Sequence, residues 1–564
     1  MAYTRRHGRI EVLMRIKLCG ALLLGVTLFA RQPEHARHAM VVVQEPLAAD
    51  VGLRVLQSGG NAIDAAVAIG FALAVTYPYA GNIGGGGFML ARFADGRTTF
   101  IDFREKAPMA ATRNMYLDSK GNVSEDSLVG WRAAGVPGTV RGLELAHRKY
   151  GRKPWTELLD PAIRLASDGY PVSYSFDASL HGESGTLLSR FPESKRIFLE
   201  TAHYGDKLVQ PELAATLKRI RDRGAADFYD GETAQKLAAA MAAHGGLITL
   251  ADLKNYQAEE SEPLRGHYHG DEIITAPPPS AGGVGLLQML GMLEGSGYEK
   301  TGAGSAASIH YVAEVMRRFY ADRSEYFGDP DFKKVPVSKL LDPKYIASRR
   351  KSIDPLHATS SDQIRPGSLS VREGTETTHF NIVDSEGNAV AVTYTLNNGY
   401  GSGVTVPGLG FLLNDEMDDF AAKPGTENLF HLIQGESNAI QPGKRPVSSM
   451  TPTIVLRDGK LFLILGAPGG SRIINGVLEV LLNVVDFRMN VQDAVDWPRF
   501  HHQWMPDVLY VEQGISPDTA GLLRGMGHKV SGIEAVAQVE AILNDGGWLQ
   551  GATDKRGNGK AEGY

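Results

Sequence analysis

Residues 377–397 read TTHFNIVDSEGNAVAVTYTLN. Apolar and polar positions alternate on both sides of the polar turn 384–388, a pattern that predicts a β-hairpin. If the turn spans those five residues, Val383 faces Ala389 and Thr377 faces Thr395. The predicted register is defined to within one residue. It places two threonine hydroxyls side by side at the open end of the hairpin.

The threonine pair 377–378 follows a polar segment, residues 355–376, which we interpret as an exposed linker. A threonine hydroxyl is a weak nucleophile unless a base lies beside it. The α-amino group of Thr377 itself could be that base, because its pKa would lie near ~7.7–8. This requires the chain to be cut before Thr377. The plainer interpretation is that two threonines begin an ordinary strand, and the segment alone favours it.

Three further motifs could complete a substrate site. The run Pro468-Gly469-Gly470-Ser471-Arg472 follows a strand-like segment, and two such glycines can turn backbone N–H groups toward an oxyanion. Arg104 could bind a carboxylate through paired hydrogen bonds. The acidic run 415–419 could bind an ammonium group. Each motif is weak alone, since charged runs are usually solvated, but together they describe a site for a zwitterion.

Composition excludes several classes of protein. The chain has 564 residues, 43% of them hydrophobic, and a net charge of −6, which suits a soluble globular protein and argues against nucleic acid as a partner. The sequence contains no GxxxxGK[ST], HExxH or GxSxG motif. Adjacent histidines, His501 and His502, would point to opposite faces of a strand, so we expect no metal there. We expect no cofactor.

The N-terminal segment resembles a signal peptide, and we assign residues 1–30 to it. An apolar run from Leu18 to Ala30 is too short for a membrane span, which needs roughly 17–25 residues. Basic residues precede the run: Arg5, Arg6, Arg9, Arg15 and Lys17. The single cysteine, Cys19, lies in this segment, so the mature chain would contain no disulfide. We therefore expect an exported protein, periplasmic or secreted, without a stable membrane span.

The chain resembles the gamma-glutamyltransferases (gamma-glutamyl transpeptidases) from about Met40 onward. Nine motifs carry the resemblance: GGNAIDAAVA at 59–68, NIGGGGFM at 82–89, DFREKAP at 102–108, TTHFNIVD at 377–384, GNAVAVTYTLNN at 387–398, LLNDEMDDF at 412–420, KRPVSSMTPTIV at 444–455, GAPGGSRII at 466–474 and PRFHHQW at 498–504. The resemblance implies an α+β fold, the four-layer αββα sandwich of N-terminal-nucleophile hydrolases. It also implies a precursor that cuts itself between Glu376 and Thr377 into a large subunit, 31–376, and a small catalytic subunit, 377–564.

The resemblance also implies roles for individual residues. It makes Thr377 the nucleophile, Thr395 its hydrogen-bonding neighbour, and Gly469 and Gly470 the oxyanion hole. The remaining matches would bind substrate: Arg104, Ser448 and Ser449 the α-carboxylate; Asn397, Glu416 and Asp419 the α-amino group. The reaction implied is cleavage of the γ-glutamyl amide of glutathione or a related compound through an enzyme ester, with transfer to water, an amino acid or a peptide.

One position departs from many bacterial members of the family. Residues 423–430 resemble a lid loop, and Phe430 stands where many members have tyrosine, so an aromatic cover is kept without its hydroxyl group. Other functions remain open from sequence. They are a cephalosporin or glutaryl acylase, a poly-γ-glutamate hydrolase, and an exported γ-glutamyl-peptide binding protein without turnover.

Overall fold

The computed structural model describes residues 31–364, 376–423 and 435–564. The hairpin forms as β10 (Glu376–Val383) and β11 (Ala389–Asn397), with Val383 opposite Ala389 and Thr378 opposite Tyr394. This register is the predicted one. It breaks at a bulge between Glu376 and Thr378, so Thr377 has no regular partner in the ladder. The nucleophile candidate therefore lies at an irregular strand end, where a bulge can redirect a side chain.

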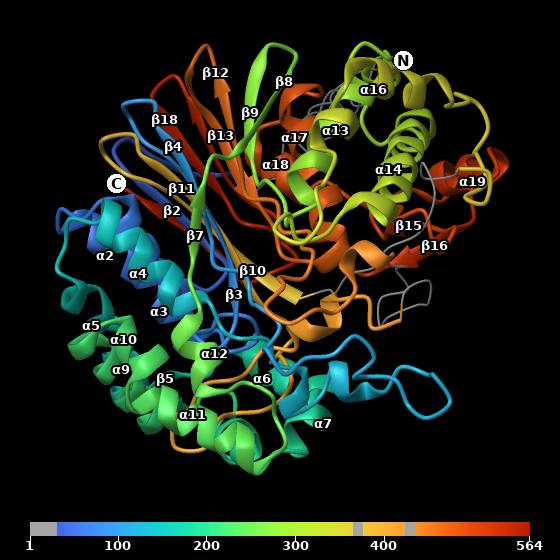
Figure 1. Cartoon of the computed structure of the whole chain (residues 1–564). Helices are drawn as coiled ribbons and strands as arrows, with labels where there is room; N and C mark the ends of the chain where they lie inside the picture. The colour runs from blue at the N-terminus through green and yellow to red at the C-terminus, as the bar shows by residue number, and fades with distance from the viewer. Residues whose placement is uncertain (1–30, 365–375, 424–434) are drawn as a thin grey trace, which may run out of the picture. The chain divides into compact units, whose positions relative to one another are not determined.

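Two seven-stranded sheets form the centre of the fold (Figure 1). The sheet that contains the hairpin, here the β10 sheet, has the order β19 (Lys560–Gly563), β2 (Met40–Val43), β10, β11, β3 (Gly86–Arg92), β4 (Thr98–Asp102), β7 (Glu259–Ser261). The second, here the β13 sheet, has the order β1 (Glu34–Ala36), β18 (Trp548–Ala552), β17 (Glu540–Asp545), β13 (Lys460–Gly466), β12 (Thr453–Arg457), β9 (Asp271–Thr275), β8 (Leu264–Tyr268). All neighbouring strands in both sheets are antiparallel.

Alternating side chains of the β10 sheet fill two different cores. On β2, Val41 and Val43 belong to the core under one helical layer, whereas Met40 and Val42 face the β13 sheet. Phe88 and Leu90 of β3 likewise join the core between the sheets, and Met89 joins the helical side. Because a strand has a period of two, one strand contributes to both cores. Near-continuous apolar runs in these strands follow from this double burial.

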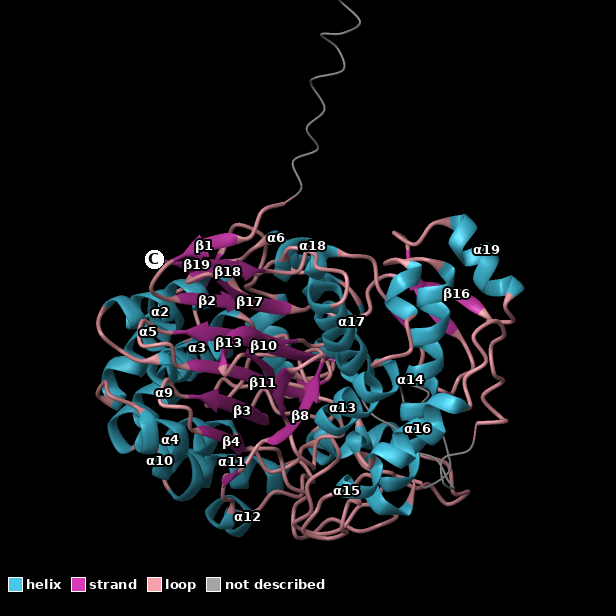
Figure 2. Ribbon diagram, turned by 90° about the horizontal axis from the view of Figure 1, so that it is seen from above, coloured by secondary structure: helices cyan, strands magenta, loops and turns pink. Residues whose placement is uncertain are grey.

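Helices cover the outer face of each sheet (Figure 2). Against the β10 sheet lie α2 (Pro46–Gln57), α3 (Ala62–Thr76) and α4 (Thr139–Tyr150), with α5 (Trp155–Asp168) and α9 (Pro211–Arg223) packed behind them. Against the β13 sheet lie α13 (Gly282–Leu293), α17 (Ile473–Val485) and α18 (Val491–Asp496), with α14 (Ala306–Tyr326) behind α13. The order helix, sheet, sheet, helix is the αββα sandwich that the resemblance implied.

Helix α3 shows why the sequence forms this layer. Asn61 and Asp64 make a capping box at its start, each side chain accepting from the backbone N–H of the other. All residues of the helix are buried, because apolar residues occupy nearly every face. It is clamped between the β10 sheet and α5.

Strands from both sides of residue 376 share both sheets. In the β10 sheet, β2 lies between β10 and β19, so residues 40–43 pair with residues 380–383 and 560–563. In the β13 sheet, β9 pairs with β12. Residues 33–564 accordingly form one compact unit. The polar stretch before Thr377 is therefore not a boundary between two folded domains.

Three sequence predictions concern residues outside the described ranges. These are the signal segment 1–30, residues 365–375 of the polar stretch before the proposed cleavage site, and Phe430 of the lid. Within the described ranges, no helix combines the length and the apolar character that crossing a membrane requires.

Candidate functional site

Thr377 is buried at the start of β10, with 5% of its surface exposed. Its hydroxyl donates to the hydroxyl of Thr395 on β11 at 3.5 Å, which is a long hydrogen bond. The predicted hairpin register placed these two side chains opposite each other. The Thr395 hydroxyl also accepts from the Asn397 backbone N–H at 2.7 Å. Asn82 donates to the Thr395 carbonyl at 2.8 Å. Thr395 is thus held in place by hydrogen bonds to both its side chain and its backbone.

The glycine pair 469–470 follows β13, which faces the hairpin across the inter-sheet core. At Gly466, a Cβ atom would lie 2.2 Å from the imidazole of His379, so the two strands touch here and tolerate no side chain. His379 is two residues beyond Thr377, so the last residue of β13 lies close to the first part of β10. Gly469 and Gly470 have φ values of 134° and 55°, a conformation that glycine adopts without strain. Their peptide groups can therefore take an orientation that other residues would resist.

The His379 side chain fills the space between β10 and Gly466 of β13. Its ring nitrogens interact with the Thr393 hydroxyl at 2.8 Å and the Asn381 side-chain amide oxygen, Oδ1, at 3.0 Å. Burial lowers its pKa to about 3, so the ring is neutral at neutral pH. A neutral, hydrogen-bonded imidazole fills the space between the sheets without adding charge beside Thr377.

Arg104 lies beyond the end of β4 and is surrounded by acids. Its guanidinium contacts Glu416 at 2.7 Å, Asp419, and Glu105 at 3.6 Å. All four side chains are buried. We refer to these four residues as the Arg104 cluster. Arg104 also donates to the carbonyl of Val447 at 3.2 Å, so the guanidinium lies next to the start of the 448–449 serine pair.

Backbone and amide hydrogen bonds join the rest of the predicted site to this cluster. Asn397 donates from its side chain to the carbonyl of Asp415 at 3.1 Å, which ties β11 to the acidic turn. Asn438 donates to the Asp419 carbonyl at 2.6 Å and accepts from the Val447 N–H at 3.2 Å. Hydrogen bonds therefore link the end of the hairpin to the acidic turn, and the acidic turn to Val447, which precedes the serine pair.

The acidic groups of the site outnumber its one guanidinium, and burial opposes their ionisation. Burial raises the pKa of Glu105 to about 8, even though Arg104 opposes that shift. Burial also raises the pKa of Glu416 and of Asp415 well above their ordinary values. Both carboxylate oxygens of Glu105 lack a hydrogen-bond donor among the residues that the structure describes. A buried site with surplus carboxylates favours a cationic ligand.

The structure brings together Thr377 with Thr395, and Arg104 with Glu416 and Asp419. Gly469 and Gly470 follow β13, whose last residue, Gly466, touches His379. The sequence did not indicate several residues that contact these groups. The sequence-based prediction did not include Glu105, although Glu105 directly follows Arg104. Strand alternation would put these two side chains on opposite faces. The prediction also missed Asn438 and Arg323, which donates to the Ser449 hydroxyl at 3.4 Å from helix α14. No local pattern could have indicated these two, since their contacts are remote in sequence.

The adjacent histidines have separate partners. His501 contacts the Asn475 amide nitrogen at 2.7 Å and the Gln503 oxygen at 2.8 Å. His502 accepts from the Trp504 backbone N–H at 3.0 Å. Burial lowers the pKa of His501 to about 3 and that of His502 to about 4. Both rings are neutral hydrogen-bonding groups of the interior.

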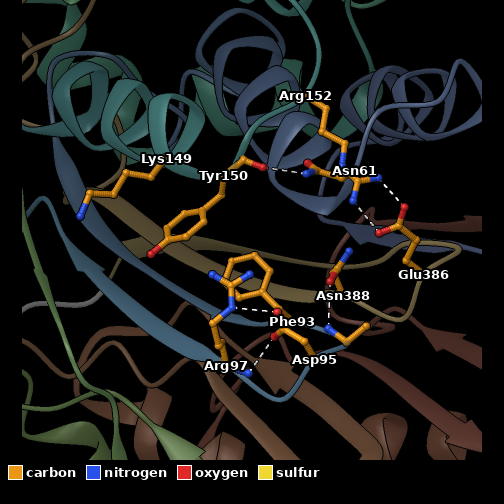
Figure 3. A pocket seen from close by; sticks show the side chains of 10 residues that line it. Asn61, Phe93, Asp95, Arg97, Lys149, Tyr150, Arg152, Glu386 and Asn388 are labelled. Carbon is orange, nitrogen blue, oxygen red and sulfur yellow. Dashed lines mark hydrogen bonds and ion pairs between the residues drawn. The ribbon is translucent and has the colours of Figure 1, made fainter.

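A surface pocket lies at the turn end of the hairpin, the end opposite Thr377 (Figure 3). Glu386 of the turn pairs there with Arg152, whose Nη2 donates at 2.6 Å. Arg97 pairs with Asp95 at 2.8 Å. Because these charged groups neutralise one another and the pocket is at the far end of β10, it does not belong to the Thr377 site.

Comparisons with known proteins agree with this geometry. A family model for gamma-glutamyltranspeptidase matches residues 48–564. The chain is 49% identical over 526 residues to the glutathione hydrolase proenzyme of a Pseudomonas species, covering 92% of this chain and 91% of the relative. It is 48% identical over 529 residues to the glutathione hydrolase proenzyme of Escherichia coli, covering 93% and 91%.

Solved structures extend the comparison to the fold. The gamma-glutamyltranspeptidase of Pseudomonas nitroreducens complexed with L-DON is 47% identical, with a TM-score of 0.55, and covers 57% of this chain and 96% of its own. The cephalosporin acylase of Bacillus halodurans is 27% identical, with a TM-score of 0.83, and covers 95% and 97%. The motifs, the shared sandwich and the identity over nearly the whole chain together show that this protein belongs to the gamma-glutamyltranspeptidase family.

Proposed function

We propose that this protein cleaves the γ-glutamyl amide bond of glutathione and related compounds and passes the γ-glutamyl group to water or to an amino acid or peptide. One observation carries the proposal. Thr377 begins a strand beside Thr395, and an arginine–carboxylate cluster suited to an amino-acid head group lies in the same site. The relatives named glutathione hydrolase support the substrate class.

Cleavage before Thr377 would release the α-amino group that the chemistry needs. The amine takes the proton of the Thr377 hydroxyl while Oγ1 attacks the γ-carbonyl carbon. The carbonyl oxygen becomes an oxyanion, which the N–H groups of Gly469 and Gly470 would stabilise. Breaking the C–N bond transfers the proton to the leaving amine and gives a γ-glutamyl ester on Thr377. Water or an acceptor amine then attacks the ester and restores the hydroxyl.

The Arg104 cluster would recognise the other end of the substrate. The α-carboxylate replaces part of the acidic shell around Arg104 and also meets Ser448 and Ser449. The α-ammonium group then pairs with the carboxylates thus displaced, Glu416 and Asp419, and with the Asn397 side chain. The zwitterion would in effect insert into an ion pair that already exists, which keeps every buried charge compensated.

Maturation and export are further parts of the proposal. Relatives named proenzymes support a cut chain, with a large subunit 31–376 and a small subunit 377–564. The solved Pseudomonas nitroreducens chain, which covers only 57% of this one, is also in keeping with two subunits. Basic residues before the apolar run 18–30 support export to the periplasm or the medium.

An acylase function is the second candidate, because the fold also matches a cephalosporin acylase over most of its length. The surplus carboxylates favour a substrate with an α-ammonium group. Two chromogenic anilides that differ only in this group, γ-glutamyl and glutaryl, separate the candidates. We expect kcat/KM to be higher for γ-glutamyl anilide; equal or reversed preference would favour the acylase.

The nucleophile is tested by Thr377→Ala. We expect one uncut chain without activity, because both the hydroxyl and the cleavage chemistry depend on this residue. The parent should instead give a small subunit of residues 377–564, one third of the 60.9 kDa chain, on a denaturing gel. Thr378→Ala is the matched control: its hydroxyl donates to Gln44 at 2.8 Å, away from Thr395, so cutting should persist. A cut and active Thr377→Ala protein would refute the assignment.

A further inference from the structure

Three metal-ligand side chains meet on the surface, outside the site described above. Asp177 and His181 lie one turn apart on α6 (Tyr174–His181), and His203 lies in the turn that precedes β6 (Lys207–Leu208). One ligand atom from each lies within 4.8 Å of the other two. Among the described residues, this is the one group of three such side chains that comes so close.

The turn that carries His203 is fixed to helix α6 by protein contacts. The Tyr204 backbone N–H donates to Asp177 Oδ1 at 3.2 Å, and the rings of Tyr174 and Tyr204 meet edge to face at 6.0 Å. The His181 and His203 rings are then 5.9 Å apart between centroids. His203 therefore faces His181 because of the fold, so a metal would bind residues that are already close together.

Backbone hydrogen bonds anchor the same turn from the other side. The Val172 N–H donates to the Asp206 carbonyl at 2.9 Å, and the Gly205 N–H donates to the Val172 carbonyl at 3.0 Å. These bonds continue the short pairing of β5 (Tyr170–Pro171) with β6. Both ends of the turn are thus held, which limits the conformational cost of gathering ligands.

The ligand set indicates which metal class would bind. Two imidazoles and one carboxylate suit Zn²⁺ and similar divalent transition metals, whereas Mg²⁺ and Ca²⁺ prefer oxygen ligands. Ligand atoms around tetrahedral Zn²⁺ are roughly 3.3 Å apart, given Zn–N distances of about 2.0–2.1 Å. His181 Nδ1 and Asp177 Oδ1 are already 3.4 Å apart. The His181 side chain is about half-exposed, and its Nδ1 also lies 2.9 Å from the Asp177 backbone carbonyl, so metal binding would require His181 to give up that contact.

We propose that Asp177, His181 and His203 form a surface site for one Zn²⁺-class ion, with water completing the coordination. The ion would tether α6 to the 203–206 turn. Helix α6 also contacts the segment after Asn397, through a 2.5 Å hydrogen bond between the hydroxyls of Ser179 and Tyr400. The proposal is independent of the proposed function, since none of the three ligands touches the Thr377 site residues in the contacts described above.

The test is a Zn²⁺ titration of untagged protein by calorimetry. We expect one site in the parent, and His181→Ala, His203→Ala and Asp177→Asn each to weaken binding about tenfold or more. His357→Ala is the matched control, because exposed His357 lies 3.3 Å from Asp354 and so forms the same kind of histidine–carboxylate pair, but among the described residues this pair belongs to no group of three close ligand side chains. The control should bind Zn²⁺ as the parent does.

Unchanged Zn²⁺ affinity in the His181→Ala/His203→Ala double variant would overturn the proposal, and so would equal weakening by His357→Ala. Thermal unfolding adds a readout, since Zn²⁺ should raise the Tm of the parent and not that of the double variant. If the double variant does not fold, anomalous diffraction at the zinc edge decides on crystals of the parent. A peak between the three side chains supports the site, and its absence at excess Zn²⁺ rejects it.

Discussion

Two buried ion-pair clusters in this molecule use the same residue types but differ in charge balance. The Arg104 cluster sets one guanidinium against three carboxylates. In the Arg499 cluster, consisting of Arg499, Arg556, Glu512 and Asp554, two guanidinium groups meet two carboxylates, and Arg499 contacts Asp554 at 2.7 Å. The first lies in the proposed substrate site and the second ties the C-terminal segment into the β13 side of the fold.

The pKa values follow the difference in balance. Although burial alone would raise it, Arg499 and Arg556 hold the pKa of Asp554 below its ordinary value. Burial outweighs the single arginine in the other cluster and raises the pKa of Glu105. In the balanced cluster the carboxyl group of Asp554 keeps its charge, whereas the surplus acids of the Arg104 cluster hold protons more tightly, so a cationic ligand could take the place of such a proton. We therefore expect the Arg499 cluster to affect stability and the Arg104 cluster to affect binding.

The largest expected effect is on the balanced cluster. Asp554→Asn removes the carboxylate that faces two buried guanidinium groups, and we expect a loss of about 3–5 kcal/mol in the free energy of unfolding. Urea unfolding in the uncut Thr377→Ala background measures it on a single polypeptide. Asp95→Asn is the control, because Asp95 forms an exposed pair with Arg97 at 2.8 Å and should matter little. Equal losses would erase the distinction between buried and exposed pairs.

Arg104→Lys tests the binding cluster. Lysine keeps the charge but cannot make the paired hydrogen bonds of a guanidinium, so we expect donor binding to weaken by ~1–3 kcal/mol. The measurement is KM and kcat/KM for a γ-glutamyl anilide. Chain cutting should persist, because Arg104 would serve the substrate and not the scissile bond. An unchanged donor KM would make Arg104 structural, like Arg499.

The two clusters should also respond to opposite pH changes. Glu105 has a pKa of about 8 when folded against an ordinary 4.5, so between these values the folded state holds the extra proton and stability falls as pH rises. Its share of the slope is at most about 1.4 kcal/mol per pH unit. The lowered pKa of Asp554 acts the other way: its contribution is lost as pH falls below 3.8 and through the folded pKa.

Glu105→Gln isolates the first of these effects. We expect the urea stability of this variant to depend less on pH between 6 and 8 than that of the uncut parent background. Parallel curves for the two proteins would show that Glu105 is not the group that titrates.

The smallest expected change in stability comes from Glu416→Gln. Arg104 keeps two other carboxylates, so no buried charge is left without compensation, and we expect a change below about 1 kcal/mol. The same variant should lose much of its preference for γ-glutamyl over glutaryl anilide, since one partner of the α-ammonium group is gone. A loss as large as that of Asp554→Asn would place Glu416 among the structural acids.

The resemblance implied the αββα sandwich, whereas local patterns predicted single elements that are specified over short distances. The hairpin register between Thr378 and Val383 followed from alternation and turn length alone. The bulge at Thr377 could not be predicted this way. It departs from the alternation that defines a strand, and only the neighbouring strands determine where the ladder breaks.

The site was predictable as a set of residue types but not as a set of contacts. The acidic run 415–419 would normally be solvated, yet the structure buries it as the turn Glu416–Asp419. Glu105 contacts the Arg104 guanidinium, as Glu416 and Asp419 do. This is possible because β4 ends at Asp102, and the strict alternation of side chains ends there too. Such burial is decided by tertiary packing, which a single sequence pattern does not encode.

Both sheets contain strands from either side of residue 376, which affects how the cut protein would form and how long it would last. A cut at that point would be made in a chain whose sheets have already formed. The two fragments could separate only if β2 lost its pairing with both β10 and β19. Each fragment alone would expose unpaired strand edges and apolar faces, which aggregate. The mature protein would thus fold only once, as one continuous chain. The two subunits would stay together because their separation is slow, and we expect denaturation of the cut protein to be irreversible.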